Sequence, residues 1–367
     1  MSANSSARTE EEVLEAIEAR RRRPRRKVMS EQVTLSHGAG GKASHDLIEA
    51  LFLPELRNPL LEPLADSATV ALGGAGSPRL AFTTDSYVVK PLFFPGGDIG
   101  ELAVNGTVND LAMAGATPRC LSAGFIVEEG FAVADLSRVA ASMGAAARAA
   151  GVEIATGDTK VVERGKGDGV YINTAGIGLI ERDVELRPDR LQPGDRVLVS
   201  GTIGDHGMAI MIARGELELE VELESDTAPL VELSAALLDA GGDGIRCLRD
   251  PTRGGLATVL AELALASEVS ISLDEASLPL RAEVIGACEI LGLDPLYVAN
   301  EGKLVAVVAP EVTDATLAAL RSHPLGADAA VVAEVRPDPP GLVLLETAFG
   351  GSRVVDMLAG DPLPRIC

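Results

Sequence analysis

The sequence predicts a two-domain protein of mixed helix and strand content, in the α+β or mixed α/β class. Its 367 residues exceed the usual size of one domain, and 47% of them are apolar, which is enough for two cores. Short β-type runs alternate with segments whose apolar residues recur at helical spacing. A stretch rich in Pro, Gly and charged residues, 187–195, interrupts this alternation. We therefore expect a first domain at 29–185 and a second at 186–352.

The individual elements follow from hydrophobic periodicity. Five apolar or β-branched runs predict strands, at 80–84, 169–179, 196–199, 303–308 and 342–347. Apolar residues at i, i+3, i+4 and i+7 predict two helices. These sets are Leu136, Val139, Ala140 and Met143, and Leu256, Val259, Leu260 and Leu263. A further helical pattern covers residues 45–52.

Composition excludes several classes of protein. No run reaches the 18 apolar residues of a membrane span, and no apolar signal-peptide core is present, so we expect no membrane association. The four cysteines and four histidines are scattered and show no metal-ligand or CxxC spacing. This pattern argues against a disulfide framework or a transition-metal site, and it is typical of a cytoplasmic protein.

Charge is distributed unevenly along the chain. Residues 1–28 hold eight basic and five acidic residues, a net charge of +3. Because the whole chain has a net charge of −22, the remainder carries −25. An acidic body is a poor surface for nucleic acid, so we expect no nucleic-acid partner. We interpret 1–28 as a disordered basic extension, with Met29 as a candidate start.

A glycine-rich segment, residues 37–44, directly precedes the helical pattern at 45–52. Glycines let backbone N–H groups converge on phosphate oxygens, and a lysine adds positive charge. The residues of interest are Gly40, Gly41 and Lys42. The spacing is not that of a Walker loop, so an ordinary surface turn remains an alternative.

Five aspartates follow strand-like runs or lie in small-residue segments: Asp66, Asp85, Asp110, Asp158 and Asp250. Each aspartate alone is more typical of a helix cap or a turn. Together they favour a site for a metal and a nucleotide, because an acidic protein that binds polyphosphate needs a cation to offset repulsion. Magnesium takes such oxygen ligands.

The sequence ends in Pro364-Arg365-Ile366-Cys367, after a segment punctuated by Gly and Pro. We predict a mobile tail over 353–367 whose sulfur visits a partner protein and then the chain's own site. The alternative is a frayed end with an idle thiol.

These segments resemble the AIR-synthase-like (PurM-like) ATP-binding superfamily and, within it, the HypE family of hydrogenase maturation factors. The resemblance covers about residues 32–367 and leaves out the basic extension. The ATP motifs are shared with selenophosphate synthetase and thiamine-phosphate kinase, whereas the terminal Pro-Arg-Ile-Cys singles out the HypE family. Its markers are 37–44, 83–91, 105–118, 156–161, 250–255, 300–303 and 364–367.

The resemblance implies an ATP-dependent carbamoyl dehydratase. A carbamoyltransferase partner, HypF, would load a carbamoyl group onto Cys367, and dehydration would leave a thiocyanate. The cyanide would then pass to iron on a HypC–HypD scaffold, as a ligand of the NiFe-hydrogenase centre. ATP and Mg²⁺ would turn the amide oxygen into a phosphate leaving group.

The resemblance also implies roles for individual residues. Glu301 would act as the base on nitrogen and Lys160 would stabilise oxygens or relay a proton, beside the nucleophile Cys367. Without the family, Glu301 is an ordinary solvated carboxylate and Lys160 a surface lysine. The nucleotide would contact Gly40, Gly41, Lys42, Asp85, Asn105, Asp110, Asp158, Asp250 and Thr252. The metal would contact Asp66, Asp85, Asp110 and Asp158.

Family members pair through their first domains into a shared β-barrel, so the resemblance implies a homodimer. Two other functions remain open. The chain could be another ATP-dependent small-molecule kinase or synthetase of the superfamily, or a non-catalytic module whose tail only docks a partner.

Overall fold

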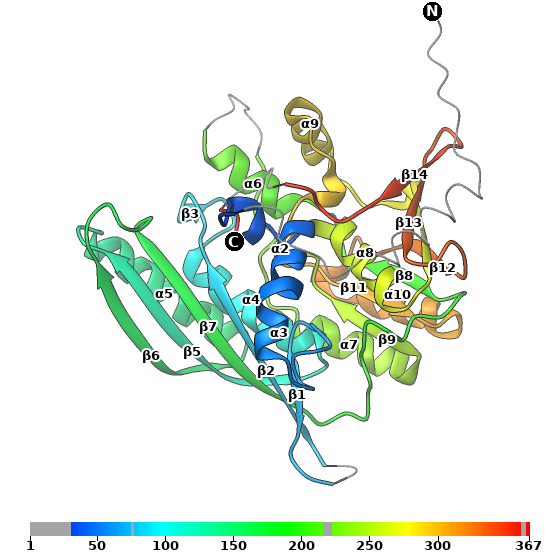
Figure 1. The fold of residues 1–367 in the computed structure, drawn as a ribbon, viewed down its shortest axis with the longest axis horizontal. Helices are drawn as coiled ribbons and strands as arrows, with labels where there is room; N and C mark the ends of the chain where they lie inside the picture. Colours follow the sequence, from blue (N-terminus) through cyan, green and yellow to red (C-terminus); the bar gives the residue numbers. More distant parts are fainter. Residues whose placement is uncertain (1–30, 75–76, 216–221, 361–364) are drawn as a thin grey trace, which may run out of the picture.

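Two β-sheets, each accompanied by helices, lie side by side in the computed structural model, which describes residues 31–74, 77–215, 222–360 and 365–367 (Figure 1). The predicted mixed fold with two units is confirmed. The boundary expected at 185/186 falls between the last strand of one sheet and the first strand of the other. The basic extension expected at 1–28 lies outside the described residues.

The first sheet has five strands in the order β1-β2-β7-β5-β6. They are β1 (Ala68–Ala71), β2 (Arg79–Tyr87), β5 (Thr117–Glu128), β6 (Glu153–Val162) and β7 (Val170–Ile180), beside the small ladder of β3 (Phe93–Phe94) and β4 (Gly97–Asp98). Neighbouring strands are antiparallel except β5 and β6, which are parallel. The parallel pair needs a crossover, and helix α5 (Val133–Ala149) supplies it.

Helix α4 (Ile99–Met113) packs beside α5 on one face of this sheet and is almost entirely buried. Asp98 caps it, since its side chain accepts from the N–H groups of Gly100 and Glu101. Small residues let the helix lie close to the strands, and a Cβ at Gly106 would lie 2.2 Å from the Tyr87 hydroxyl. The many small residues blur the amphipathic pattern, which is why the sequence did not predict this helix.

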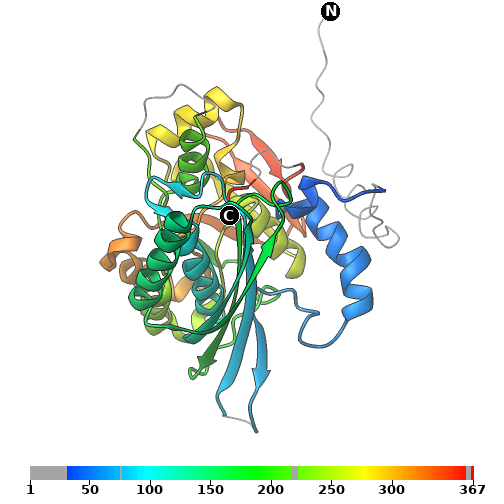
Figure 2. The same ribbon diagram turned by 90° about the vertical axis from the view of Figure 1, so that its left-hand side faces the viewer.

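A helical segment lies on the opposite side of strands β1 and β2 from α4 and α5 (Figure 2). It runs through α2 (Lys42–Leu47), a π-helical stretch (Ile48–Phe52) and α3 (Leu53–Leu56), so the helix expected at 45–52 is longer than predicted. The segment attaches to the second unit, because the Lys42 N–H donates to the Leu358 carbonyl at 2.8 Å.

The second sheet has seven strands in the order β14-β13-β10-β12-β8-β11-β9. They are β8 (Arg196–Val199), β9 (Ile245–Arg249), β10 (Ser270–Asp274), β11 (Val305–Val308), β12 (Ala330–Arg336), β13 (Leu342–Glu346) and β14 (Ser352–Val355). The helices are α6 (Asp205–Ala213), α7 (Val231–Gly241), α8 (Gly255–Ala266), α9 (Ala282–Leu291) and α10 (Thr313–Ser322). Short 3-10 turns lie at Leu35–Gly38, Gly242–Gly244, Glu275–Ser277, Pro295–Tyr297, Pro310–Val312 and Pro324–Gly326.

Most predicted elements are found. The runs at 80–84, 169–179, 196–199 and 342–347 lie in or overlap β2, β7, β8 and β13, and the two periodic patterns lie in α5 and α8. The strand expected from 303 begins at Val305, because the Leu304 N–H donates to the Ser200 hydroxyl at 2.9 Å and not to a neighbouring strand.

The tail boundary is also different. Residues 352–355 form β14, and Leu358 is buried, so the tail expected from 353 belongs to the second sheet and its core up to that residue.

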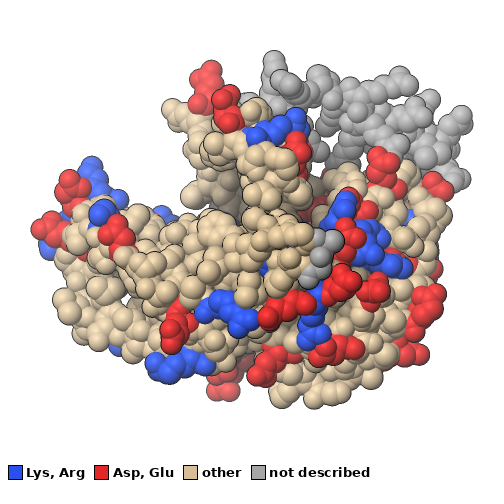
Figure 3. Space-filling view, turned by 90° about the horizontal axis from the view of Figure 1, so that it is seen from below, with Lys and Arg blue, Asp and Glu red and all other residues tan. Residues whose placement is uncertain are grey.

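The described helices include none that is both long and apolar enough to cross a membrane. On the face shown in Figure 3, Lys and Arg side chains lie interspersed with Asp and Glu side chains.

Candidate active site

Three aspartates from distant parts of the chain converge between the two sheets. Asp66 precedes β1, Asp110 lies on α4, and Asp250 follows β9. One oxygen from each carboxylate lies within 4.8 Å of the others. The sequence reasoning had placed Asp250 with the nucleotide and left it out of the metal set, whereas the structure puts it in the cluster.

Burial and mutual repulsion disfavour the charged forms of this cluster. Burial raises the pKa of Asp66 to about 6 and that of Asp250 to about 8, and the Arg249 guanidinium opposes both shifts. The pKa of Asp110 also lies well above its ordinary value, first through burial and then through Asp250 and Asp85. A bound cation would relieve this repulsion, and clustered carboxylate oxygens suit a hard divalent ion such as Mg²⁺. The residues present therefore fit the predicted metal.

Neighbouring hydroxyl groups hold the carboxylates in place. The Thr83 hydroxyl lies 2.6 Å from Asp110 Oδ2 and 2.9 Å from the Asp66 carbonyl. The Tyr87 hydroxyl donates to Asp85 Oδ2 at 3.0 Å. Asp85 stands beside the cluster and interacts with it electrostatically, but it is not one of the three converging carboxylates.

The Cys367 sulfur lies among charged groups that border this cluster. Burial raises the pKa of its thiol, the Arg253 guanidinium opposes that shift, and the Glu301 and Asp85 carboxyl groups add to it. A cavity of about 380 Å³ opens beside it, lined in part by Arg253, Tyr297 and Cys367. The structure thus brings a thiol, a carboxyl group and a guanidinium group to one place.

Glu301 is only 3% exposed, and burial followed by repulsion from Asp250 raises its pKa well above the ordinary value. The Asp226 carboxylate accepts from the Glu301 N–H at 3.0 Å and also pairs with Lys303 at 3.1 Å. Between them, a Cβ at Gly302 would lie 1.7 Å from the Asp226 carbonyl oxygen, so only glycine fits there. Glu301 is therefore a buried and firmly placed carboxyl group, not a solvated one.

A groove of about 1110 Å³ separates the 42–56 helical segment from β2, and it reaches Asp66 of the aspartate cluster. Gly40, Gly41, Asp66, Thr83 and Thr84 are among the residues that line it. Gly40 has φ +72°, and a Cβ there would lie 2.6 Å from Arg253, so the glycine is required for this close approach. The groove is large enough for a nucleotide.

Three other predicted nucleotide contacts have different surroundings. Lys42 pairs with Asp46 at 2.8 Å and is not among the residues that line the groove. Asn105 is buried in α4, where its amide nitrogen donates to the Thr227 hydroxyl at 3.2 Å. Thr252 forms the turn after Asp250.

Asp158 and Lys160 lie apart from this centre. Both are on β6, at the edge of the first sheet, and their side chains are 70% and 71% exposed. They form an ion pair of 3.1 Å, and hydrogen bonding from Lys160 lowers the pKa of Asp158. Within one chain Asp158 does not join the three converging aspartates, because it lies on an exposed edge strand of the first sheet.

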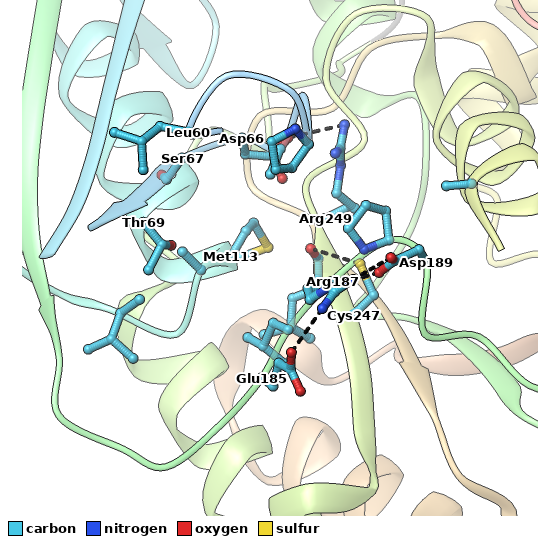
Figure 4. A pocket seen from close by; sticks show the side chains of 18 of the residues that line it. Leu60, Asp66, Ser67, Thr69, Met113, Glu185, Arg187, Asp189, Cys247 and Arg249 are labelled. Carbon is cyan, nitrogen blue, oxygen red and sulfur yellow. Dashed lines mark hydrogen bonds and ion pairs between the residues drawn. The ribbon is translucent and has the colours of Figure 1, made fainter. Parts of the chain in front are cut away.

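A second cavity, of about 570 Å³, lies on the other side of Asp66 (Figure 4). Figure 4 shows the Arg249 guanidinium joined to Asp66, with Cys247 and Met113 nearby. The nitrogen–oxygen distance of that pair is 3.1 Å. Burial raises the pKa of Cys247 to about 12, so this thiol is a poor nucleophile. The Asp66–Arg249 pair forms a wall between this cavity and the groove.

Sequence reasoning missed Arg249, Arg253, Tyr87 and His206. The two arginines flank Asp250 within the 249–255 motif, so their place beside an acidic cluster was a usable signal. His206 lies alone in an apolar helix, and no pattern marked it.

The chain matches two family descriptions. Residues 65–180 match "AIR synthase related protein, N-terminal domain", and residues 192–344 match "AIR synthase related protein, C-terminal domain".

Curated relatives match over nearly their whole length. A protein of Rhizobium leguminosarum bv. viciae named "Carbamoyl dehydratase HypE" is 56% identical, with 93% of this chain and 96% of the relative covered. The protein of the same name from Escherichia coli K12 is 50% identical, covering 91% and 99%.

Solved structures agree with these matches. "Hydrogenase Maturation Protein HypE in complex with ATP" has a TM-score of 0.76 and 49% identity, covering 92% of this chain and 100% of that one. A chain of a "HypE-HypF complex" has a TM-score of 0.80 and 48% identity, covering 85% and 99%. Thiamine monophosphate kinase from Aquifex aeolicus, at 20% identity and a TM-score of 0.61, with 84% and 96% covered, shares the fold.

Proposed function

This chain belongs to the AIR synthase related proteins and, within them, to the HypE family of carbamoyl dehydratases, and we propose that it dehydrates a carbamoyl group on Cys367 with ATP. The product is a thiocyanate that supplies cyanide for the iron centre of NiFe hydrogenase. The observation that carries this proposal is the position of the Cys367 sulfur, which shares a cavity with Arg253 and interacts electrostatically with Glu301 and Asp85.

The chemistry requires an activated oxygen. In S–C(O)NH₂ the oxygen would have to leave as hydroxide, which is a very poor leaving group. The amide oxygen attacks the γ-phosphorus of ATP, ADP departs, and the C–O bond then breaks to release phosphate. Nitrogen loses both of its protons as the C≡N bond forms. Asp66, Asp110 and Asp250 would hold Mg²⁺, which would neutralise charge on the phosphates.

Glu301 is the group that removes protons from nitrogen. Its raised pKa makes its ionised form a stronger base than an ordinary carboxylate, and it interacts electrostatically with the sulfur that carries the substrate. The Arg253 guanidinium interacts electrostatically with the same sulfur and with the carboxyl groups of Asp85 and Glu301. It therefore offsets negative charge where the phosphorylated intermediate forms. The nucleotide occupies the groove beside Gly40 and Gly41.

Lys160 and Asp158 act, in this proposal, in the site of a second copy. In the strand register Lys160 pairs with Ile126 on β5, so it lies on the sheet face that helices α4 and α5 leave uncovered. Phe82 on the same face is 45% exposed and Ile126 is 44% exposed, an apolar surface suited to a homodimer. The nucleotide groove opens on this same face, so pairing through it brings the two residues toward the partner's nucleotide.

The partners follow from the same scheme. HypF loads the carbamoyl group onto Cys367, and a HypC–HypD complex accepts the cyanide. The reaction takes place in the cytoplasm, where the four free cysteines of this chain stay reduced.

Intact-mass measurement tests the proposal. The protein should gain one carbamoyl mass with HypF, carbamoyl phosphate and only as much ATP as loading consumes. After HypF and nucleotide are removed, Mg-ATP should then cause the loss of one water. Cys367→Ala should show neither change. A carbamoyl group that persists in this variant, mapped to Cys120 or Cys247, would contradict the proposal.

The same experiment separates the alternatives. A small-molecule kinase or synthetase would keep its turnover in Cys367→Ala. A non-catalytic docking module would not hydrolyse ATP even when its tail is carbamoylated.

A further inference from the structure

Residues 365–367 are held by their backbone, through groups that the proposed chemistry does not use. His206 Nε2 lies 3.0 Å from the Ile366 carbonyl oxygen, and Arg214 Nη2 donates to the Arg365 carbonyl at 2.8 Å. The Lys90 N–H donates to the same Arg365 carbonyl at 3.1 Å. All three contacts are made to the main-chain carbonyl oxygens of Arg365 and Ile366. They therefore position the tail whatever side chains these two residues carry.

The hydrogen-bond polarity at His206 is determined by its neighbours. A carbonyl oxygen can only accept, so the proton of the ring must lie on Nε2. On the other side Nδ1 lies 2.7 Å from the Ser225 hydroxyl, which itself accepts from the Thr227 N–H at 3.1 Å. The Ser225 hydroxyl therefore donates to Nδ1. Burial lowers the pKa of His206, which favours the neutral ring that this arrangement requires.

Arg214 completes the attachment from the end of α6. Its Nε donates to the Lys90 carbonyl at 2.8 Å while its Nη2 holds Arg365, so it ties the tail to the segment that follows β2. Arg365 has φ +57°, a left-handed conformation that residues other than glycine rarely adopt. A free chain end would seldom take this shape, so the contacts select it. Ile366 is buried at 4% exposure and anchors the same segment in the core of the first unit.

The segment that orients His206 also holds the proposed base. Ser225 bonds the histidine, and the next residue, Asp226, accepts from the Glu301 N–H. Sulfur and base are thus placed by neighbouring residues of one short segment.

We propose that His206, Ser225 and Arg214 are positioning residues that dock residues 365–367 by their backbone and so hold the Cys367 sulfur against Glu301. The docking itself is independent of the reaction, whereas its effect on dehydration rests on the proposed function. Loading needs an undocked sulfur and dehydration needs a docked one, so loss of these contacts should slow only the second step.

Alkylation of the full-length protein by iodoacetamide measures docking directly, with Cys120 as an internal reference in the same digest. Arg214→Ala and His206→Asn should each raise the alkylation rate of Cys367 about 3–10-fold, the factor expected from the loss of one or two hydrogen bonds. His206→Gln keeps an amide nitrogen near the Nε2 position and should stay close to the wild-type rate. Arg182→Ala, which removes an arginine paired with Asp239, is the matched control.

His206 is fully buried, so thermal unfolding must first show that its variants fold. If the His206 variants do not fold, Arg214→Ala tests the proposal alone, because Arg214 lies at the surface end of its helix. Unchanged Cys367 alkylation in Arg214→Ala would overturn the docking role.

A single-turnover assay on carbamoylated protein tests the catalytic consequence. Arg214→Ala should dehydrate more slowly by a similar factor, with HypF-dependent loading and nucleotide affinity unchanged. Faster alkylation with a normal dehydration rate would show that docking does not position the sulfur. A wild-type protein that never dehydrates would contradict the proposed function, and the alkylation result would still decide the docking.

Discussion

The buried aspartates and the exposed Asp158–Lys160 pair use the same residue type in opposite settings. Burial raises the pKa of Asp66, Asp110 and Asp250, whereas a neighbouring lysine lowers that of Asp158 in open solvent. The first group is assembled by one folded chain. The second group, Asp158 and Lys160, lies on an uncovered sheet face, away from the three buried aspartates.

The difference shows that a motif identifies chemistry without giving its location. All of these aspartates follow strands or lie in small-residue segments, and the sequence treated them alike. Their burial separates three carboxylates that one chain brings together from residues that, in the proposed dimer, serve a second copy.

The largest effect is expected inside the enclosed centre. Glu301→Gln keeps volume and hydrogen bonding but loses basicity, so single-turnover dehydration should fall about 10²–10⁴-fold. Nucleotide titration should give nearly unchanged affinity, and carbamoylated Cys367 should accumulate in the intact-mass spectrum. The matched control is Glu283→Gln, at an exposed position on α9. A normal rate in Glu301→Gln would remove this residue from the mechanism.

The next largest effect compares one aspartate from each group. Asp110→Asn removes a charge from the converging carboxylates and should weaken Mg-ATP binding at least about tenfold, since even an outer partner of a metal site is worth that much. Asp158→Asn should have a smaller effect, and loading by HypF should be normal in both. Equal losses of Mg-ATP affinity by isothermal titration would erase the distinction between buried and exposed aspartates.

Mixed dimers test whether the exposed pair serves a second copy. Lys160→Met and Glu301→Gln should each be nearly inactive alone. When equal amounts are allowed to exchange subunits, half of the dimers are mixed and one of their two sites has both intact residues, so about a quarter of the dehydration activity should return. No recovery, with exchange verified by mass, would show that Lys160 acts within its own chain or not at all.

The smallest effect is a pH-dependent thermal shift. The pKa values of Asp66 and Asp250 are raised to about 6 and about 8, so the folded protein binds protons that the unfolded chain has already released. The contribution of these groups to stability therefore falls as the pH rises from about 4 to about 8. Mg²⁺ competes with those protons, so it should raise the Tm more at pH 8 than at pH 5.5. Scanning calorimetry that shows equal shifts at both pH values would rule out metal binding at the cluster.

Much of the fold was accessible from periodicity. Strands β2, β7, β8 and β13 and helices α5 and α8 carry strong local patterns, and all were predicted. Helix α4 was not, because its Gly and Ala residues serve close packing against β2 and so hide the apolar stripe. Strand β6 was missed as well, because its largely exposed residues lack the alternation of a half-buried strand.

The site was predictable in kind but not in arrangement. Aspartates, glycines and Glu301 were identified from motifs, yet the convergence of Asp66, Asp110 and Asp250 depends on contacts between segments 44 to 184 residues apart. Arg253 and His206 act through such contacts as well, and nothing in the neighbouring sequence of His206 marks it.

Gly302 turns this geometry into a constraint on how the sequence can change. A Cβ there would lie 1.7 Å from the Asp226 carbonyl oxygen, so even alanine requires the loop that carries Glu301 to move. If residues 226, 302 and 303 were randomised together and active clones selected, position 302 should return glycine while positions 226 and 303 vary. Substitutions of the side chains around this loop are thus easier to accommodate than changes in its backbone conformation. Relatives with other chemistries would be expected to differ first in these side chains.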